Sequence, residues 1–147
     1  MGFFDKVKGA KEAETKLTKE EAFAAVALSA VAADGVITEE EANGLVLGLI
    51  RMKLYRGYNG NQMGAILNKC INIIKKEGLD ALMAKAKEGL PAELTETAFA
   101  VAADLTLADG EIANEEKKFL EKIQVSLGVP EDKAVTIIEV MLIKNKG

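Results

Sequence analysis

The sequence predicts an all-α fold: a single compact domain of about seven to eight helices over residues 1–147, containing two pseudosymmetric units of helix, Asp-Gly loop and helix. Composition is the first reason, because Ala, Leu, Lys and Glu are abundant while only 5% of residues are aromatic, a mixture that favours helix over sheet. Length is the second reason. A chain of 147 residues has the usual size of one domain and can bury a core without disulfides or structural zinc. Capping patterns followed by apolar residues at helical spacing are the third.

The first two helices are marked by capping boxes. The runs Thr18–Glu21 and Thr38–Glu41 each place a Thr three residues before a Glu, so that each side chain can bond the other residue's backbone amide. We expect the first helix to reach about Ala33, where Asp34-Gly35 breaks it. The second helix carries Leu45, Leu49 and Met52 on one face.

The later helices are placed by Gly, Pro and apolar spacing. Residues 55–61 are rich in turn formers and predict the longest loop, before a helix over 63–76 that Gly78 ends and a shorter helix that ends at Gly89. Pro91 fits the first turn of a helix that runs to about residue 108, followed by a helix over 114–127. Pro130 opens a last helix, whose expected inner face carries Val135, Ile138 and Leu142.

An internal repeat becomes visible at an offset of 75 residues. Between residues 25–45 and 100–120, ten of 21 positions are identical, including both Asp-Gly loops. The repeat units extend over about 18–53 and 91–127, after an amphipathic N-terminal segment at 1–17. That segment carries Phe3, Phe4 and Val7 on one side and Lys on the other, so it either folds back on its own domain or docks on a partner or membrane surface.

Each repeated loop reads Ala-Asp-Gly-x-Ile-x-x-Glu-Glu and has two interpretations. In the first it is only structural: Gly supplies a left-handed turn, Ile anchors the loop, and Glu caps the next helix. In the second it binds a cation. An Asp in the last turn of a helix faces the negative end of the macrodipole, which disfavours it by ~0.3–1 kcal/mol, and a bound cation would reverse the sign of this interaction.

The cation interpretation names five candidate ligands. Each unit offers a pair of carboxylates, and the two pairs are expected to merge into one cluster if the units pack around a twofold axis; the candidates are Asp34, Glu41, Asp104, Asp109 and Glu116. Oxygen ligands select a hard ion, Ca²⁺ or Mg²⁺. The loop is not an EF-hand, because Val36 or Glu111, followed by Ile37 or Ile112, stand where that 12-residue loop requires alternating oxygen ligands.

Composition also argues against several function classes. The net charge is −4 with both signs interspersed, so no basic face for nucleic acid is evident. The chain has no His, no nucleophile motif and no Gly-rich phosphate loop, and Cys70 stands alone in an apolar run, so we expect no enzyme. No apolar run approaches the ~20 residues of a membrane span, and the N-terminus lacks a secretory signal, which predicts a cytoplasmic protein.

At these repeated motifs, and at its start over Gly2–Ala10, the chain resembles the TerB family of bacterial tellurite-resistance proteins. The resemblance covers nearly the whole chain except residues 55–89. It implies a cytoplasmic protein of the tellurite and chemical-stress response, whose acidic patch binds divalent cations. It also implies partners of the TerC type, which are integral membrane proteins, and of the TerD type, and hence peripheral association with the inner membrane face.

The leading hypothesis is therefore a non-enzymatic, cation-responsive module that links a membrane partner to a stress response. The alternative is a structural protein-interaction adaptor in which the Asp-Gly loops act only as helix caps. A carboxylate-dependent hydrolase is the third hypothesis, which requires an aromatic-lined cleft beside the acids.

Overall fold

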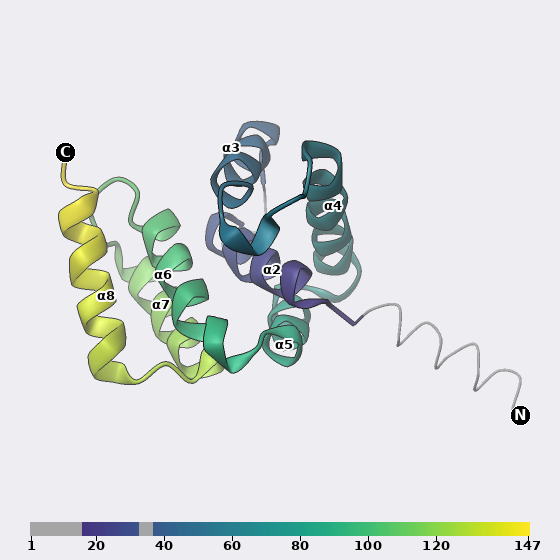
Figure 1. The fold of residues 1–147 in the computed structure, drawn as a ribbon. Coiled ribbons are helices and arrows are strands. Elements are labelled where there is room, and N and C mark those ends of the chain that lie inside the picture. The colour runs from purple at the N-terminus through teal and green to yellow at the C-terminus, as the bar shows by residue number, and fades with distance from the viewer. Residues whose placement is uncertain (1–15, 33–36) are drawn as a thin grey trace, which may run out of the picture.

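The structure is a computed structural model that describes residues 16–32 and 37–147. Within these ranges it contains seven α-helices, two short 3-10 helices and no strand, which confirms the all-α class (Figure 1). The longest helix, α4, has 18 residues, and none of the described helices has the length and apolarity needed to cross a membrane. The α-helices are α2 (Lys19–Val31), α3 (Glu39–Leu49), α4 (Gly60–Glu77), α5 (Leu79–Gly89), α6 (Thr95–Thr106), α7 (Asn114–Leu127) and α8 (Glu131–Lys144).

Local capping chemistry fixes where the early helices begin. The Thr18 hydroxyl accepts from the Glu21 amide at 3.1 Å and the Glu21 carboxylate accepts from the Thr18 amide at 3.0 Å, which confirms the first predicted box. The box at the start of α3 repeats these distances. A third box, which the sequence analysis missed, joins Asn59 to Gln62 and starts α4.

The predicted loop at 55–61 is shorter than expected. The box at Asn59 starts α4 at Gly60, and a 3-10 turn, Lys53–Tyr55, precedes it. Tyr55 is 1% exposed, and its hydroxyl donates to the Glu20 carbonyl at 2.7 Å while its ring packs edge-on against Phe23. The predicted loop therefore contributes one of the largest buried side chains of the core.

The start of α6 also differs from the prediction. Pro91 precedes a second 3-10 turn, Ala92–Leu94, and α6 begins only at Thr95. The predicted helix at 114–127 is confirmed as α7, and Gly128 ends it in a left-handed conformation at φ 71°, where its amide donates to the Val125 carbonyl.

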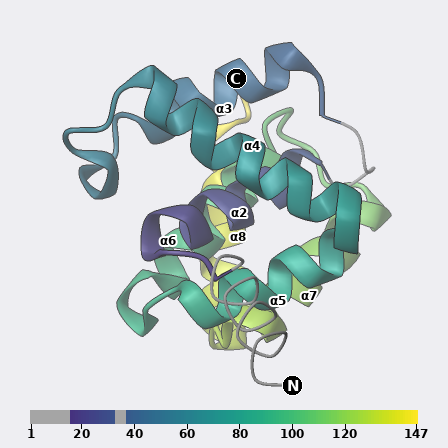
Figure 2. The same ribbon diagram turned by 90° about the vertical axis from the view of Figure 1, so that its right-hand side faces the viewer.

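The centre of the fold is α2. Residues 22–29 of this helix are all buried, four of them Ala, and α2 packs against α4, α5 and α6. Figure 2 shows α4 crossing on one side of α2 and α5 lying on the other. A helix that is apolar all round belongs in a core, and its small side chains let the neighbouring helices approach closely.

In contrast, α8 lies at the edge of the bundle, where it packs mainly against α6 (Figure 1). Only Ala134 of α8 is fully buried, while Ile138 and Leu142 are half-buried. The prediction that Val135 belongs to the inner face is wrong, because this side chain is 49% exposed. The last helix is thus attached by a narrow contact and carries apolar side chains in contact with solvent.

The Tyr55 hydroxyl bond provides a test of how residues 53–58 are held. Replacing Tyr55 by Phe removes a hydrogen bond to α2 without changing the ring packing, so the free energy of unfolding should fall by about 1 kcal/mol. The measurement is urea denaturation followed by circular dichroism. Tyr58→Phe is the control, because Tyr58 is only half-buried; equal losses in both variants would contradict the role of the Tyr55 bond.

Candidate functional site

The two predicted glutamates both act as helix caps. Glu41 accepts from the Thr38 amide at 3.0 Å, and Glu116 accepts from the Ala113 amide at 2.8 Å, where α7 begins. The box at Glu116 is only half complete, because the side chain of Ala113 has no oxygen that could accept from the Glu116 amide. Each cap uses one carboxylate oxygen and leaves the second oxygen of the same group for another partner.

Asp109 does not lie in the last turn of a helix. Because α6 ends at Thr106 and Leu107 is its C-cap, Asp109 is in the loop, where its carboxylate accepts from the Glu111 amide at 3.0 Å. This bond within the Asp-Gly loop offsets the electrostatic conflict that motivated the cation interpretation, and the assumption that Asp109 opposes the dipole of α6 is wrong. Asp34, its counterpart in the first unit, lies outside the described residues.

Asp104 is engaged at the other end of the chain. Its carboxylate accepts from the Asn145 side-chain amide at 2.8 Å and pairs with the Lys144 ammonium at 3.2 Å. These bonds tie α6 to the end of α8, so the side chain already has a cation as its neighbour. Asp104 therefore acts as a structural tether between two helices in this conformation.

The structure does bring Glu41 and Glu116 to one place. Both line a pocket of about 390 Å³ together with Glu115, and we call this feature the acidic pocket. Its remaining lining residues are Ala30, Val31, Leu105, Thr106 and Phe119. The hydroxyl oxygen of Thr106 is buried without a hydrogen-bond partner among the described residues. Within the same residues, no three acidic or cysteine side chains converge closely enough to hold a metal ion.

Cys70 lies in the core of the bundle, on α4. Burial raises the pKa of its thiol to about 12, and the negative charge of Glu21 acts in the same direction while Lys69 opposes it. At neutral pH the thiol therefore stays protonated, and the thiolate that nucleophilic or redox chemistry requires is scarce. The geometry agrees with the interpretation of Cys70 as a core residue.

The backbone geometry at Gly110 explains why the second Asp-Gly loop requires a glycine. Its φ of 79° lies in the left-handed region, and an added Cβ would stand 2.7 Å from the Asn145 carbonyl oxygen. The loop between α6 and α7 thus packs directly on the backbone at the end of α8. Backbone geometry and a close contact both require Gly here, independently of any ligand.

Replacing Gly110 by Ala should lower the free energy of unfolding by about 2–4 kcal/mol, because left-handed strain adds to a backbone clash. Gly57→Ala is the matched control: its φ is 89°, but nothing lies within 4 Å of the added Cβ, so it should cost only about 1–2 kcal/mol. Denaturant unfolding of both variants provides the measurement. Equal losses would show that the contact with Asn145 does not constrain the loop.

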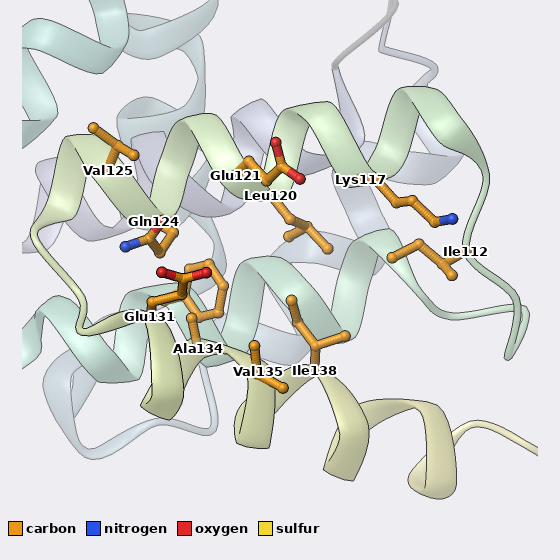
Figure 3. A pocket seen from close by; sticks show the side chains of 11 residues that line it. Ile112, Lys117, Leu120, Glu121, Gln124, Val125, Glu131, Ala134, Val135 and Ile138 are labelled. Carbon is orange, nitrogen blue, oxygen red and sulfur yellow. The ribbon is translucent and has the colours of Figure 1, made fainter.

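A second candidate site lies between α7 and α8 and was not predicted. It is a groove of about 470 Å³, which we call the α7–α8 groove, and Figure 3 shows side chains of both helices pointing into it. Its apolar lining consists of Phe99, Ile112, Leu120, Val125, Ala134, Val135 and Ile138, and its charged and polar lining of Lys117, Glu121, Gln124 and Glu131. The sequence signal for this groove is that apolar residues extend around most of the last helix, more than a single inner face requires.

Comparisons of the chain with protein-family models, with curated proteins and with solved structures find no match.

Proposed function

We propose that this chain is a non-enzymatic interaction module of the TerB type that binds an amphipathic helix of a partner protein in the α7–α8 groove. The single observation that carries the proposal is the exposed apolar lining of this groove. Val125 on α7 is 71% exposed and Val135 on α8 is 49% exposed, and both line the groove together with the buried Phe99 of α6.

The groove has the chemistry that helix recognition needs. Its floor is apolar, and charged side chains stand along it, with Glu121 and Lys117 on α7 and Glu131 at the start of α8 (Figure 3). An amphipathic helix can place its apolar stripe on such a floor and its polar face towards solvent. Full burial of each valine side chain is worth ~1.5–3 kcal/mol, which favours an occupied groove.

The resemblance of the sequence to the TerB family suggests the biological setting of this proposal. A partner of the TerC type, which is an integral membrane protein, or of the TerD type would supply the helix, at the inner membrane face and during tellurite or chemical stress. The two helix, loop and helix units would form the pseudosymmetric frame. In support, the first helices of both units, α2 and α6, pack against each other.

Binding is tested with a synthetic amphipathic peptide of about 15 residues, with apolar residues at helical spacing, added to the isotope-labelled chain. We expect saturable chemical-shift changes concentrated at Leu120, Val125, Val135 and Ile138. The double variant Val125→Glu, Val135→Glu should raise the dissociation constant at least about tenfold, because the partner then faces two charges instead of two apolar groups.

Two controls define the result. Leu47→Glu changes a side chain that is 65% exposed on α3, away from the groove, and should leave the affinity unchanged. A peptide of the same composition in scrambled order, without an apolar stripe, should not bind. Shift changes spread over the whole surface, or equal weakening by Leu47→Glu, would contradict a specific groove.

A second candidate function is favoured by the acidic pocket. Glu41, Glu115 and Glu116 line one pocket beside a buried hydroxyl that has no partner among the described residues. We infer that a divalent cation, Ca²⁺ or Mg²⁺, is the ligand that would use the free oxygens of Glu41 and Glu116. In this version the module would respond to the ion. The described carboxylates do not converge as a metal site in this conformation, so binding would require their side chains to move, and Asp109 would join only if its loop rearranges. Asp34 is a further candidate ligand outside the described residues.

Calorimetric titration of the metal-free chain with Ca²⁺ and Mg²⁺ tests the second candidate. The double variant Glu41→Gln, Glu116→Gln should weaken binding at least about tenfold, because Gln preserves the capping box but removes the charge. Glu88→Gln, at an exposed position on α5, is the control. A separate Asp34→Asn, Asp109→Asn variant measures the contribution of the loops. If neither ion gives a heat of binding, Glu41 and Glu116 act only as helix caps.

A further inference from the structure

The outer side of α8 is apolar beyond the residues that line the groove. In the described part of the chain, Leu47, Val125, Val135, Val140 and Ile143 are the exposed large apolar side chains, and three of them belong to α8. Ile143 is 74% exposed and Val140 is 50% exposed, and neither lines the α7–α8 groove. Among the described residues, α8 therefore carries more of the exposed large apolar side chains than any other helix.

These residues follow a pattern that is symmetric about Glu139. Val135 and Ile143 lie four residues before and after Glu139, and Asp132 and Lys146 lie seven residues before and after it. Residues spaced by four and by seven share one face of a helix. On α8 this face reads acid, apolar, Glu, apolar, and the base Lys146 follows just after the C-cap Asn145.

We propose that this face of α8 binds the same face of a second copy of the chain, antiparallel and around a twofold axis near Glu139. In that arrangement Val135 of each copy meets Ile143 of the other, and Asp132 of each copy meets Lys146 of the other. Apolar contact and charge complementarity are thus satisfied at both ends by a single twofold operation.

The charged residues at the ends are available for this contact. All of Asp132, Val135, Ile143 and Lys146 are exposed, and neither Asp132 nor Lys146 forms an ion pair with another described residue. The neighbouring bases Lys133 and Lys144 are already paired, with Glu96 and Asp104. The twofold arrangement thus uses one acid and one base that have no ion-pair partner among the described residues.

The same symmetry limits the affinity. Two Glu139 side chains meet at the axis, where like charges repel, and helices of 14 residues bury less area than a standard stable interface. We therefore expect a reversible dimer with a dissociation constant on the order of 10–100 µM. Val135 belongs to both the groove and this face of α8, whereas Ile143, Glu139 and Lys146 do not line the groove. Variants at Ile143 and Lys146 therefore test the dimer without altering the groove.

Sedimentation equilibrium of the full chain over a range of concentrations tests the dimer. The average mass should rise from one chain to two as concentration increases through the expected dissociation constant. Ile143→Asp should weaken association at least about tenfold, because a charge replaces an apolar contact on both copies. Leu47→Asp, at the similarly exposed position on α3, should leave the association unchanged.

Two further variants test the orientation and the register. Asp132→Lys and Lys146→Asp should each weaken the dimer several-fold, and the double variant should restore it, because the exchanged charges attract again only in an antiparallel pair. Glu139→Gln should tighten the dimer several-fold by removing the repulsion at the axis. Circular dichroism confirms that each variant is folded, and Ile143→Ser replaces Ile143→Asp if the latter is not.

The proposal is overturned if the wild-type chain sediments as one chain at all concentrations, or if its mass exceeds that of two chains. It is also overturned if Leu47→Asp weakens association as much as Ile143→Asp, or if the charge exchange does not restore the dimer. None of these outcomes affects peptide binding to the α7–α8 groove, so the two proposals fail separately.

Discussion

The structure depends on one steric constraint, the burial of α2 on every side. Four other helices surround this helix, so it can carry only small or well-packed apolar residues, and residues 22–29 meet this requirement with four alanines. Its one buried polar side chain, Ser29, is satisfied by donating to the Val26 carbonyl at 2.6 Å. At the entrance to the helix, Gly89 of α5 lies so close that an added Cβ would stand 2.6 Å from the Leu17 carbonyl oxygen. The bundle closes because these contacts leave no room for larger groups.

The acidic pocket can be understood from the same arrangement. The first turns of α3 and α7 carry Glu41, Glu115 and Glu116, and the pocket brings these two turns together. Each helix N-terminus has a partial positive charge, and two of them side by side would repel each other unless acidic side chains stood between them. Clustered carboxylates are therefore expected here as helix caps, and a cation would be an additional occupant rather than the reason for the cluster.

Features that depend on neighbouring residues could be predicted from the sequence, and features that depend on distant residues could not. The boxes at Thr18 and Thr38 and the span of α7 were predicted because capping acts within three or four residues. Tyr55 was missed because its partner, Glu20, lies 35 residues away. Val135 was misplaced because α8 is apolar around most of its circumference, so that periodicity alone cannot tell which side faces α6. Of the predicted ligands, Glu41 and Glu116 share a pocket, while Asp104 is held by Lys144, a partner 40 residues away that the spacing did not reveal.

The buried thiol has a further consequence for how this molecule can be studied. Cys70 is the only cysteine of the chain and sits where α2 meets α4, with its sulfur 3.8 Å from the Glu21 carbonyl oxygen. An alkylating reagent can reach it only when these two helices separate, since both access and ionisation are suppressed in the closed bundle. The rate at which Cys70 is alkylated therefore measures how often α2 and α4 separate. The native cysteine serves as the probe, so no label has to be introduced.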